Sequence, residues 1–209
     1  DGFCGSELLS EIRARYLEVV EDPQHSTLVA RKGGNGPEDE QVYRYALTDP
    51  LSTIPSLSDL LAGPLTAFLE EHYRRPFRFH SVGLWRTTHV PADIAVNDPP
   101  YSLKWHCDHH TTDTVKLFTL LSDVTDDDGP FHFLDRNRSK TILHQGFRDR
   151  HHYGIPLDVI EDPRYLQKFV GKIGDSVFCN TTECLHRAGI PAPGHTRDIM
   201  QFRFDGARE

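Results

Sequence analysis

The sequence has few cysteines, little positive charge and no long apolar run, and each shortage excludes a class of protein. Four cysteines among 209 residues are too few for a disulfide scaffold, so a reducing, cytoplasmic setting is the simplest expectation. The formal net charge of −8 argues against DNA or RNA as a partner. No apolar stretch approaches the roughly 20 residues that a transmembrane helix needs, which argues against a membrane partner.

The length and the apolar content suit one complete domain. A chain of 209 residues, 37% of them hydrophobic, can bury a core of its own but is short for two domains. We therefore expect a single domain over residues 1–209, whose oligomeric state the sequence does not indicate. Because the chain begins at Asp1 rather than with methionine, a removed N-terminal segment stays open.

The order of the expected elements predicts the fold class. Residues 1–76 read as a mainly helical support, with one helix in the first twenty residues and another over 58–73 that Pro76 ends. Residues 77–205 read as short strands with one short helix near 163–171. The expected strands cover 78–87, 102–108, 115–124, 131–134, 176–179 and 197–204. Helices followed by short strands favour an all-β core with a helical buttress, for which a jelly roll is the best fit.

The last expected strand indicates which of its faces is buried. Alternation along the strand divides its side chains into two sets: Met200, Phe202 and Phe204 on one face, and Arg197, Ile199, Gln201 and Arg203 on the other. If the helices cover the apolar set, Arg197 points into a polar cavity. An edge strand with solvated arginines is the alternative.

A group of three separated residues has the composition of a metal site. His106 and Asp108 are two positions apart, so on a strand they project from one face while Cys107 points away. A lone His-x-Asp pair is weak evidence, but His186 would complete two imidazoles and one carboxylate. This facial triad leaves open positions on non-haem iron(II), where a co-substrate and dioxygen could bind.

Arg197 strengthens this interpretation. The segment after His186 is long enough to leave one strand, turn through residues 191–194 and return on a neighbouring antiparallel strand. An arginine placed there could lie deep in the barrel, behind the metal. Its planar guanidinium can bind a carboxylate through two hydrogen bonds, which a lysine cannot do.

Four segments carry a resemblance to a known family. The motifs WHCDHH, TDDDGPF, GDSVFCNTTECLHRAG and TRDIMQFRF resemble those of the phytanoyl-CoA dioxygenase-like family of iron(II)/2-oxoglutarate-dependent oxygenases. The resemblance covers residues 77–205, and the N-terminal third only loosely. It implies a double-stranded β-helix, a cupin-like jelly-roll barrel. It also implies that His106, Asp108 and His186 bind iron and that Arg197 pairs with the distal carboxylate of 2-oxoglutarate. Phe118 matches an aromatic residue that lines the co-substrate pocket, with plain core packing as the alternative.

The resemblance further implies a dioxygenase that uses Fe(II), 2-oxoglutarate and O2. Such an enzyme hydroxylates or otherwise oxidises a small molecule and releases succinate and CO2. Hydroxylation, desaturation, cyclisation and epimerisation stay open. Asp108 argues against halogenation, because halogenating members carry glycine or alanine at that position. One departure concerns the co-substrate contacts: Ala188 stands where relatives often have a small hydroxyl residue.

The substrate and two rival functions remain to be distinguished. Arg148 and Arg150 lie in a basic loop that would hold an anionic substrate if it folded over the barrel mouth; a solvated loop is the alternative. Lys104 shares the expected metal-side face and could approach a carboxylate. One rival is a cupin-like metalloenzyme with the same triad and no 2-oxoglutarate. The other is a catalytically silent jelly-roll binding module.

Overall fold

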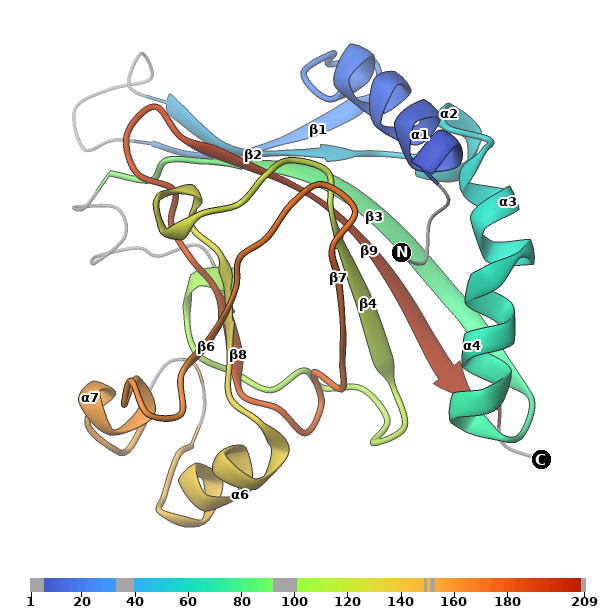
Figure 1. Ribbon diagram of the computed structural model, residues 1–209. Helices are drawn as coiled ribbons and strands as arrows, with labels where there is room; N and C mark the ends of the chain where they lie inside the picture. Colours follow the sequence, from blue (N-terminus) through green and yellow to red (C-terminus); the bar gives the residue numbers. More distant parts are fainter. Residues whose placement is uncertain (1–5, 33–39, 92–100, 149, 151–152, 208–209) are drawn as a thin grey trace.

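The computed structural model describes residues 6–32, 40–91, 101–148, 150 and 153–207 (Figure 1). Two antiparallel sheets face each other, and helices cover the outer face of the larger one. This layering follows from the alternation in the strands, because each sheet has an apolar face that must be covered. Among the described residues, no helix is both long and apolar enough to cross a membrane.

The large sheet has six strands in the order β1-β2-β3-β9-β4-β7. The strands are β1 (Ser26–Lys32), β2 (Glu40–Leu47), β3 (Phe77–Thr88), β9 (Thr196–Gly206), β4 (Val115–Leu120) and β7 (Ser176–Cys179). The strands β3, β9, β4 and β7 were all expected. The sequence analysis did not identify β1 and β2, which lie in the segment taken as helical support.

The small sheet has three strands in the order β6-β5-β8. The strands are β6 (Gln167–Phe169), β5 (Phe131–Phe133) and β8 (His186–Ala188). The helix expected near 163–171 is wrong, since β6 occupies that segment and the nearby helix is α7 (Leu157–Ile160). Pairing of β6 with β5, a contact remote in sequence, overrides the local helical pattern.

The N-terminal helices form a layer on one side of the large sheet (Figure 1). They are α1 (Ser6–Val19), α2 (Pro50–Thr53), α3 (Leu57–Ala62) and α4 (Pro64–Tyr73). The helix expected over 58–73 is divided into α3 and α4, because Gly63 and Pro64 interrupt it. Ile12 and Leu65 share one buried cluster with Met200, Phe202 and Phe204. The predicted apolar face of β9 is thus confirmed.

The segment before the proposed metal ligands is not a strand. Residues 101–103 form a short 3₁₀ helix, η2 (Tyr101–Leu103), and His106 makes only an isolated bridge with His186. The expected strand over 102–108 is therefore wrong. Cys107 nevertheless points away from the site, because it packs against the apolar cluster around the fully buried Trp105.

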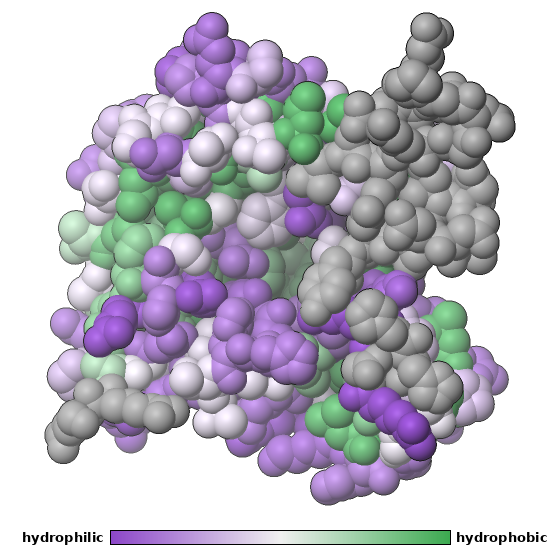
Figure 2. Space-filling model, turned by 180° about the vertical axis from the view of Figure 1, so that it is seen from behind, coloured by the Kyte–Doolittle hydropathy of each residue, from purple (hydrophilic) through white to green (hydrophobic). Residues whose placement is uncertain are grey.

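The remaining helices lie at the far side of the small sheet. One of them is α6 (Arg136–His144). Asp135 caps this helix by accepting a hydrogen bond from the backbone N–H of Arg138 at 2.8 Å. Figure 2 shows the opposite face of the molecule, on which hydrophobic side chains are interspersed with hydrophilic ones. The apolar residues are otherwise concentrated in the clusters between the layers.

Candidate metal centre

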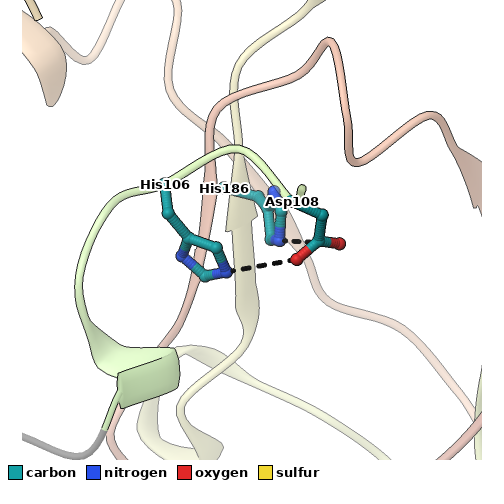
Figure 3. Close-up of side chains that lie close together, drawn as sticks. All are labelled: His106, Asp108 and His186. Atoms are coloured by element: carbon teal, nitrogen blue, oxygen red, sulfur yellow. Dashed lines mark ion pairs between the residues drawn. The ribbon is translucent and has the colours of Figure 1, made fainter. Parts of the chain in front are cut away.

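Three side chains from two separate segments converge at one point (Figure 3). His106 and Asp108 come from the segment after η2, and His186 comes from the start of β8. One nitrogen or oxygen atom from each lies within 4.8 Å of the others. His106 Nε2 is 3.6 Å from Asp108 Oδ1, and His186 Nε2 is 3.8 Å from Asp108 Oδ2.

The backbone holds the two histidines side by side. His106 donates its N–H to the carbonyl of His186 at 3.1 Å, and His186 donates to the carbonyl of His106 at 2.9 Å. The N–H of Asp108 donates to the carbonyl of Thr181 at 2.9 Å. The isolated bridge between His106 and His186, rather than a strand, therefore holds His106 and Asp108 beside His186.

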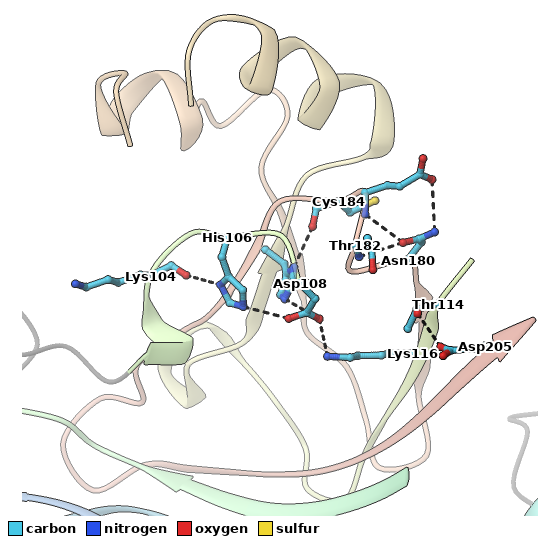
Figure 4. A network of polar contacts seen from close by, with 11 residues as sticks. Lys104, His106, Asp108, Thr114, Lys116, Asn180, Thr182, Cys184 and Asp205 are labelled. Carbon is cyan, nitrogen blue, oxygen red and sulfur yellow. Dashed lines mark hydrogen bonds and ion pairs between the residues drawn. The ribbon is translucent and has the colours of Figure 1, made fainter. Parts of the chain in front are cut away.

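Backbone carbonyls also orient both imidazole rings (Figure 4). His106 Nδ1 is 2.7 Å from the carbonyl oxygen of Lys104, and His186 Nδ1 is 2.9 Å from that of Cys184. Since a carbonyl oxygen can only accept, each Nδ1 carries the proton in these contacts. In a neutral ring, Nε2 then presents a lone pair toward Asp108, as a metal ligand must.

The charges at the site favour the ligand forms of these groups. Burial opposes ionisation of Asp108, but His106 and His186 in their protonated forms, together with the Lys116 ammonium, hold its pKa well below the usual range. Burial and the nearby His106 lower the pKa of His186 to about 3. An ionised carboxylate and a neutral imidazole are the forms that bind a divalent metal.

Lys116 is a site residue that the sequence analysis missed. Its Nζ donates to Asp108 Oδ2 at 2.6 Å (Figure 4). Lys104, which the sequence singled out instead, contributes its carbonyl oxygen to His106. The signal for Lys116 was present: it is a lone charged residue in the apolar run of β4, so its side chain needed a partner on the cavity side.

A cavity of about 220 Å³ adjoins the triad. Its wall contains the three triad residues, the stacked rings of Phe118 and Phe131, and Arg197. Phe118 therefore lines the cavity and packs in the core at once. The other lining residues are Arg44, Trp85, Ser102, Lys116, Arg150, Ala188, Ile199 and Gln201.

Arg197 reaches the cavity by a different route from the expected one. It lies on β9 in the large sheet, whereas His186 lies on β8 in the small sheet. The expectation that these two residues occupy neighbouring strands is wrong, because the chain between them crosses from one sheet to the other. Arg197 is only 3% exposed, and burial together with the charge of Arg44 lowers its pKa to about 9.

The two arginines predicted to contact substrate lie in different surroundings. Arg150 is buried and lines the cavity. Arg148 is exposed and is not among the lining residues. Positions 149, 151 and 152 of the same loop fall outside the described residues.

Comparisons with known proteins find similar solved structures but no matching family. No protein-family model and no curated protein sequence matches the chain. HygX from Streptomyces hygroscopicus, with nickel, 2-oxoglutarate and hygromycin B bound, aligns over 99% of this chain and 81% of its own (TM-score 0.60, 15% identity). The epimerase SnoN, in complex with Fe3+, alpha ketoglutarate and nogalamycin RO, aligns over 99% and 77% (TM-score 0.63, 15% identity). The non-heme alpha ketoglutarate dependent carbocyclase SnoK from nogalamycin biosynthesis aligns over 98% and 77% (TM-score 0.64, 17% identity).

At 15–17% sequence identity, these structural similarities establish the fold alone. The chain is a double-stranded β-helix, similar in structure to iron(II)/2-oxoglutarate-dependent oxygenases, and the predicted fold class is confirmed. The closer resemblance to the phytanoyl-CoA dioxygenase-like family stays a prediction.

Proposed function

We propose that this chain is a non-haem iron(II)/2-oxoglutarate-dependent dioxygenase that oxidises a small organic molecule, with hydroxylation as the expected outcome. It would consume O2 and release succinate and CO2. One observation carries the proposal: a two-histidine, one-carboxylate cluster and a buried guanidinium line the same cavity. The first suits a divalent iron, and the second suits the far carboxylate of a dicarboxylic co-substrate.

The residues present fit such a metal. His106, Asp108 and His186 would hold it, since both Nε2 atoms and the carboxylate face one point. The bound iron would supply open coordination positions and the redox chemistry. Asp108 would offset part of its charge, and the carbonyls of Lys104 and Cys184 keep the imidazoles in the required tautomer.

The remaining wall residues have separate roles. Arg197 offers a charged, two-pronged donor deep in the cavity, which would fix the orientation of 2-oxoglutarate. Phe118 and Phe131, with ring centroids 4.7 Å apart, exclude water from the space beside the metal ligands. Of the two arginines predicted to contact substrate, Arg150 lines the cavity and would have that role. Arg148 does not line the cavity.

Similarity in structure supports a small-molecule substrate. HygX has been solved with hygromycin B bound and SnoN with nogalamycin RO bound, so this fold accommodates small organic ligands beside a metal and 2-oxoglutarate. The epimerase and carbocyclase descriptions of SnoN and SnoK show that the outcome differs among similar folds. A metabolite library screened for stimulated succinate release would identify the substrate.

Spectroscopy of the anaerobic complex tests the proposal. Purified protein with Fe(II) and 2-oxoglutarate under argon should develop a visible charge-transfer band, and His106→Ala should abolish it. Metal uptake without this band would favour a cupin-like metalloenzyme that does not use 2-oxoglutarate. No metal uptake by the unaltered protein, or equal uptake by His106→Ala, would favour a silent binding module.

A further inference from the structure

Three polar residues form one row across the large sheet. Arg44 on β2 lies directly opposite Thr87 on β3, and Thr87 lies directly opposite Arg197 on β9. Directly paired residues on neighbouring strands project from the same face of a sheet. Arg44, Thr87 and Arg197 therefore point toward the same side, and both arginines line the cavity described above.

The row contains buried polar atoms that lack hydrogen-bond partners. They are Nε of Arg44, Oγ1 of Thr87, and Nε and Nη1 of Arg197. Buried donors are almost always paired in folded proteins, because an unpaired one loses its hydration without compensation. Unpaired donors on three adjacent strands therefore indicate one missing acceptor rather than three unrelated defects.

The charges of the row point to the nature of that acceptor. Burial lowers the pKa of Arg44, and burial together with Arg44 lowers that of Arg197. Among the described residues, neither guanidinium forms an ion pair with a carboxylate. Arg44 donates Nη2 to Ser102 Oγ at 2.9 Å and lies over the Trp85 ring at 5.5 Å, so its position is held without an anion. Two buried like charges side by side in the cavity wall are compensated best by an anion that both can contact.

The geometry of the sheet allows one carboxylate to meet all three side chains. Neighbouring strands are about 4.8 Å apart, so the backbones of Arg44 and Arg197 lie about 10 Å apart on either side of Thr87. Both arginines have long side chains, and a carboxylate has about four acceptor sites. It can thus accept from two guanidiniums and from the hydroxyl between them.

We propose that Arg44 and Thr87 join Arg197 in a single anion cradle for the distal carboxylate of 2-oxoglutarate. This inference rests on the proposed function. Thr87 supplies, from β3, the hydroxyl that Ala188 does not supply from β8. The second guanidinium makes the cavity selective for 2-oxo acids that carry a distal carboxylate.

Binding to the nickel-loaded protein tests the cradle without turnover. Calorimetric titration gives the Kd of 2-oxoglutarate and of 2-oxobutyrate, which lacks the distal carboxylate. Arg44→Met should weaken 2-oxoglutarate binding about 10- to 100-fold, and the isosteric Thr87→Val about 2- to 10-fold, as the loss of charged and neutral hydrogen bonds predicts. Binding of 2-oxobutyrate and of nickel should change less than about twofold. Arg148→Met, which removes an exposed arginine outside the cavity, is the matched control for charge.

The outcomes separate this inference from the proposed function. If Arg197→Met weakens 2-oxoglutarate binding while Arg44→Met behaves like Arg148→Met, the cradle is overturned and the proposed function stands. Equal weakening of 2-oxobutyrate by Arg44→Met also overturns it, because the effect would then not concern the distal carboxylate. If the unaltered nickel protein binds no 2-oxoglutarate, both fail. Arg44→Met removes an uncompensated buried charge, so it should not unfold the protein, and Thr87→Val is an independent second test.

Discussion

Lys116 constrains one oxygen of the carboxylate that is proposed to bind metal. Its Nζ is 2.6 Å from Asp108 Oδ2. The other oxygen, Oδ1, lies nearer His106 and does not contact the lysine. Residues that orient metal ligands typically change metal affinity about 10- to 100-fold when removed. We therefore expect Lys116→Met to weaken nickel binding by about that factor, measured by titration of the metal-free protein.

A matched lysine and a conservative change control this prediction. Lys172 forms an exposed pair with Asp123, so Lys172→Met should leave the nickel affinity unchanged. Lys116→Arg keeps a cation beside Asp108 and should retain part of the affinity. Equal nickel affinity of Lys116→Met and the unaltered protein would show that the orientation of Asp108 does not depend on this contact.

His132 should make stability depend on pH. Burial and the charge of Arg187 lower its pKa to about 3, and its Nδ1 has no partner among the described residues. Because the folded pKa lies below the unfolded value of about 6.5, this stability is present above about pH 6.5 and is lost as the pH falls toward 3. From about pH 7 to about pH 5 the free energy of unfolding should fall by about 2 kcal/mol through this residue. Urea unfolding of His132→Gln at both pH values should show a correspondingly smaller fall.

At the scale of elements, one turn positions the strand that pairs with β8. The 3₁₀ turn η3 (Asp126–Asp128) is closed by reciprocal hydrogen bonds between Thr125 and Asp128. Gly129 follows with φ +65°, and β5 then pairs with β8, so that Phe133 lies opposite His186. A Cβ atom at Gly129 would lie 2.5 Å from the backbone carbon of Ile190.

Two glycine substitutions separate backbone strain from steric conflict. Gly129→Ala should lower the free energy of unfolding by about 3 kcal/mol or more, because the left-handed backbone and the contact with residue 190 both oppose a side chain. Gly194 also has a positive φ, +82°, but a Cβ there meets nothing within 4 Å. Gly194→Ala should therefore cost only about 1 kcal/mol. Equal losses in urea unfolding would contradict the steric argument.

At the scale of the whole molecule, β9 separates a structural layer from the cavity. Its helix-facing side carries Asp198, which accepts from Tyr16 at 2.8 Å and is bound by Arg86 through two hydrogen bonds of 2.8 Å. Its other side carries Arg197, Ile199 and Gln201 in the cavity wall. The helices stabilise the sheet from the face that the proposed site does not use.

Tyr16→Phe tests this separation. Loss of a buried hydrogen bond to a charged acceptor should lower the free energy of unfolding by about 1–3 kcal/mol. Nickel affinity should be unchanged, because Arg86 still holds Asp198 and no cavity residue loses a partner. A fall in nickel affinity alongside the stability loss would show that the helical layer and the site are coupled.

The sequence by itself determined those features that local patterns encode. Alternation in residues 197–204 identified both faces of β9, and helical spacing identified α1. The order of the expected elements predicted the fold class, and spaced motifs selected His106, Asp108, His186 and Arg197, which the fold brings to one cavity. The faces of β9 and of α1 needed only the direction in which side chains project from a regular element. The set of site residues rested on residue types, on their spacing and on the family resemblance.

Only the tertiary structure decided which elements meet. Strand pairing turned residues 167–169 into β6 instead of a helix, and it placed His186 and Arg197 on opposite sheets. It also brought Lys116 to Asp108 and aligned Arg44 with Thr87 and Arg197. Register between strands remote in sequence depends on the packing of the whole core. A local pattern could therefore indicate that Lys116 needs a partner, but not which residue that partner is.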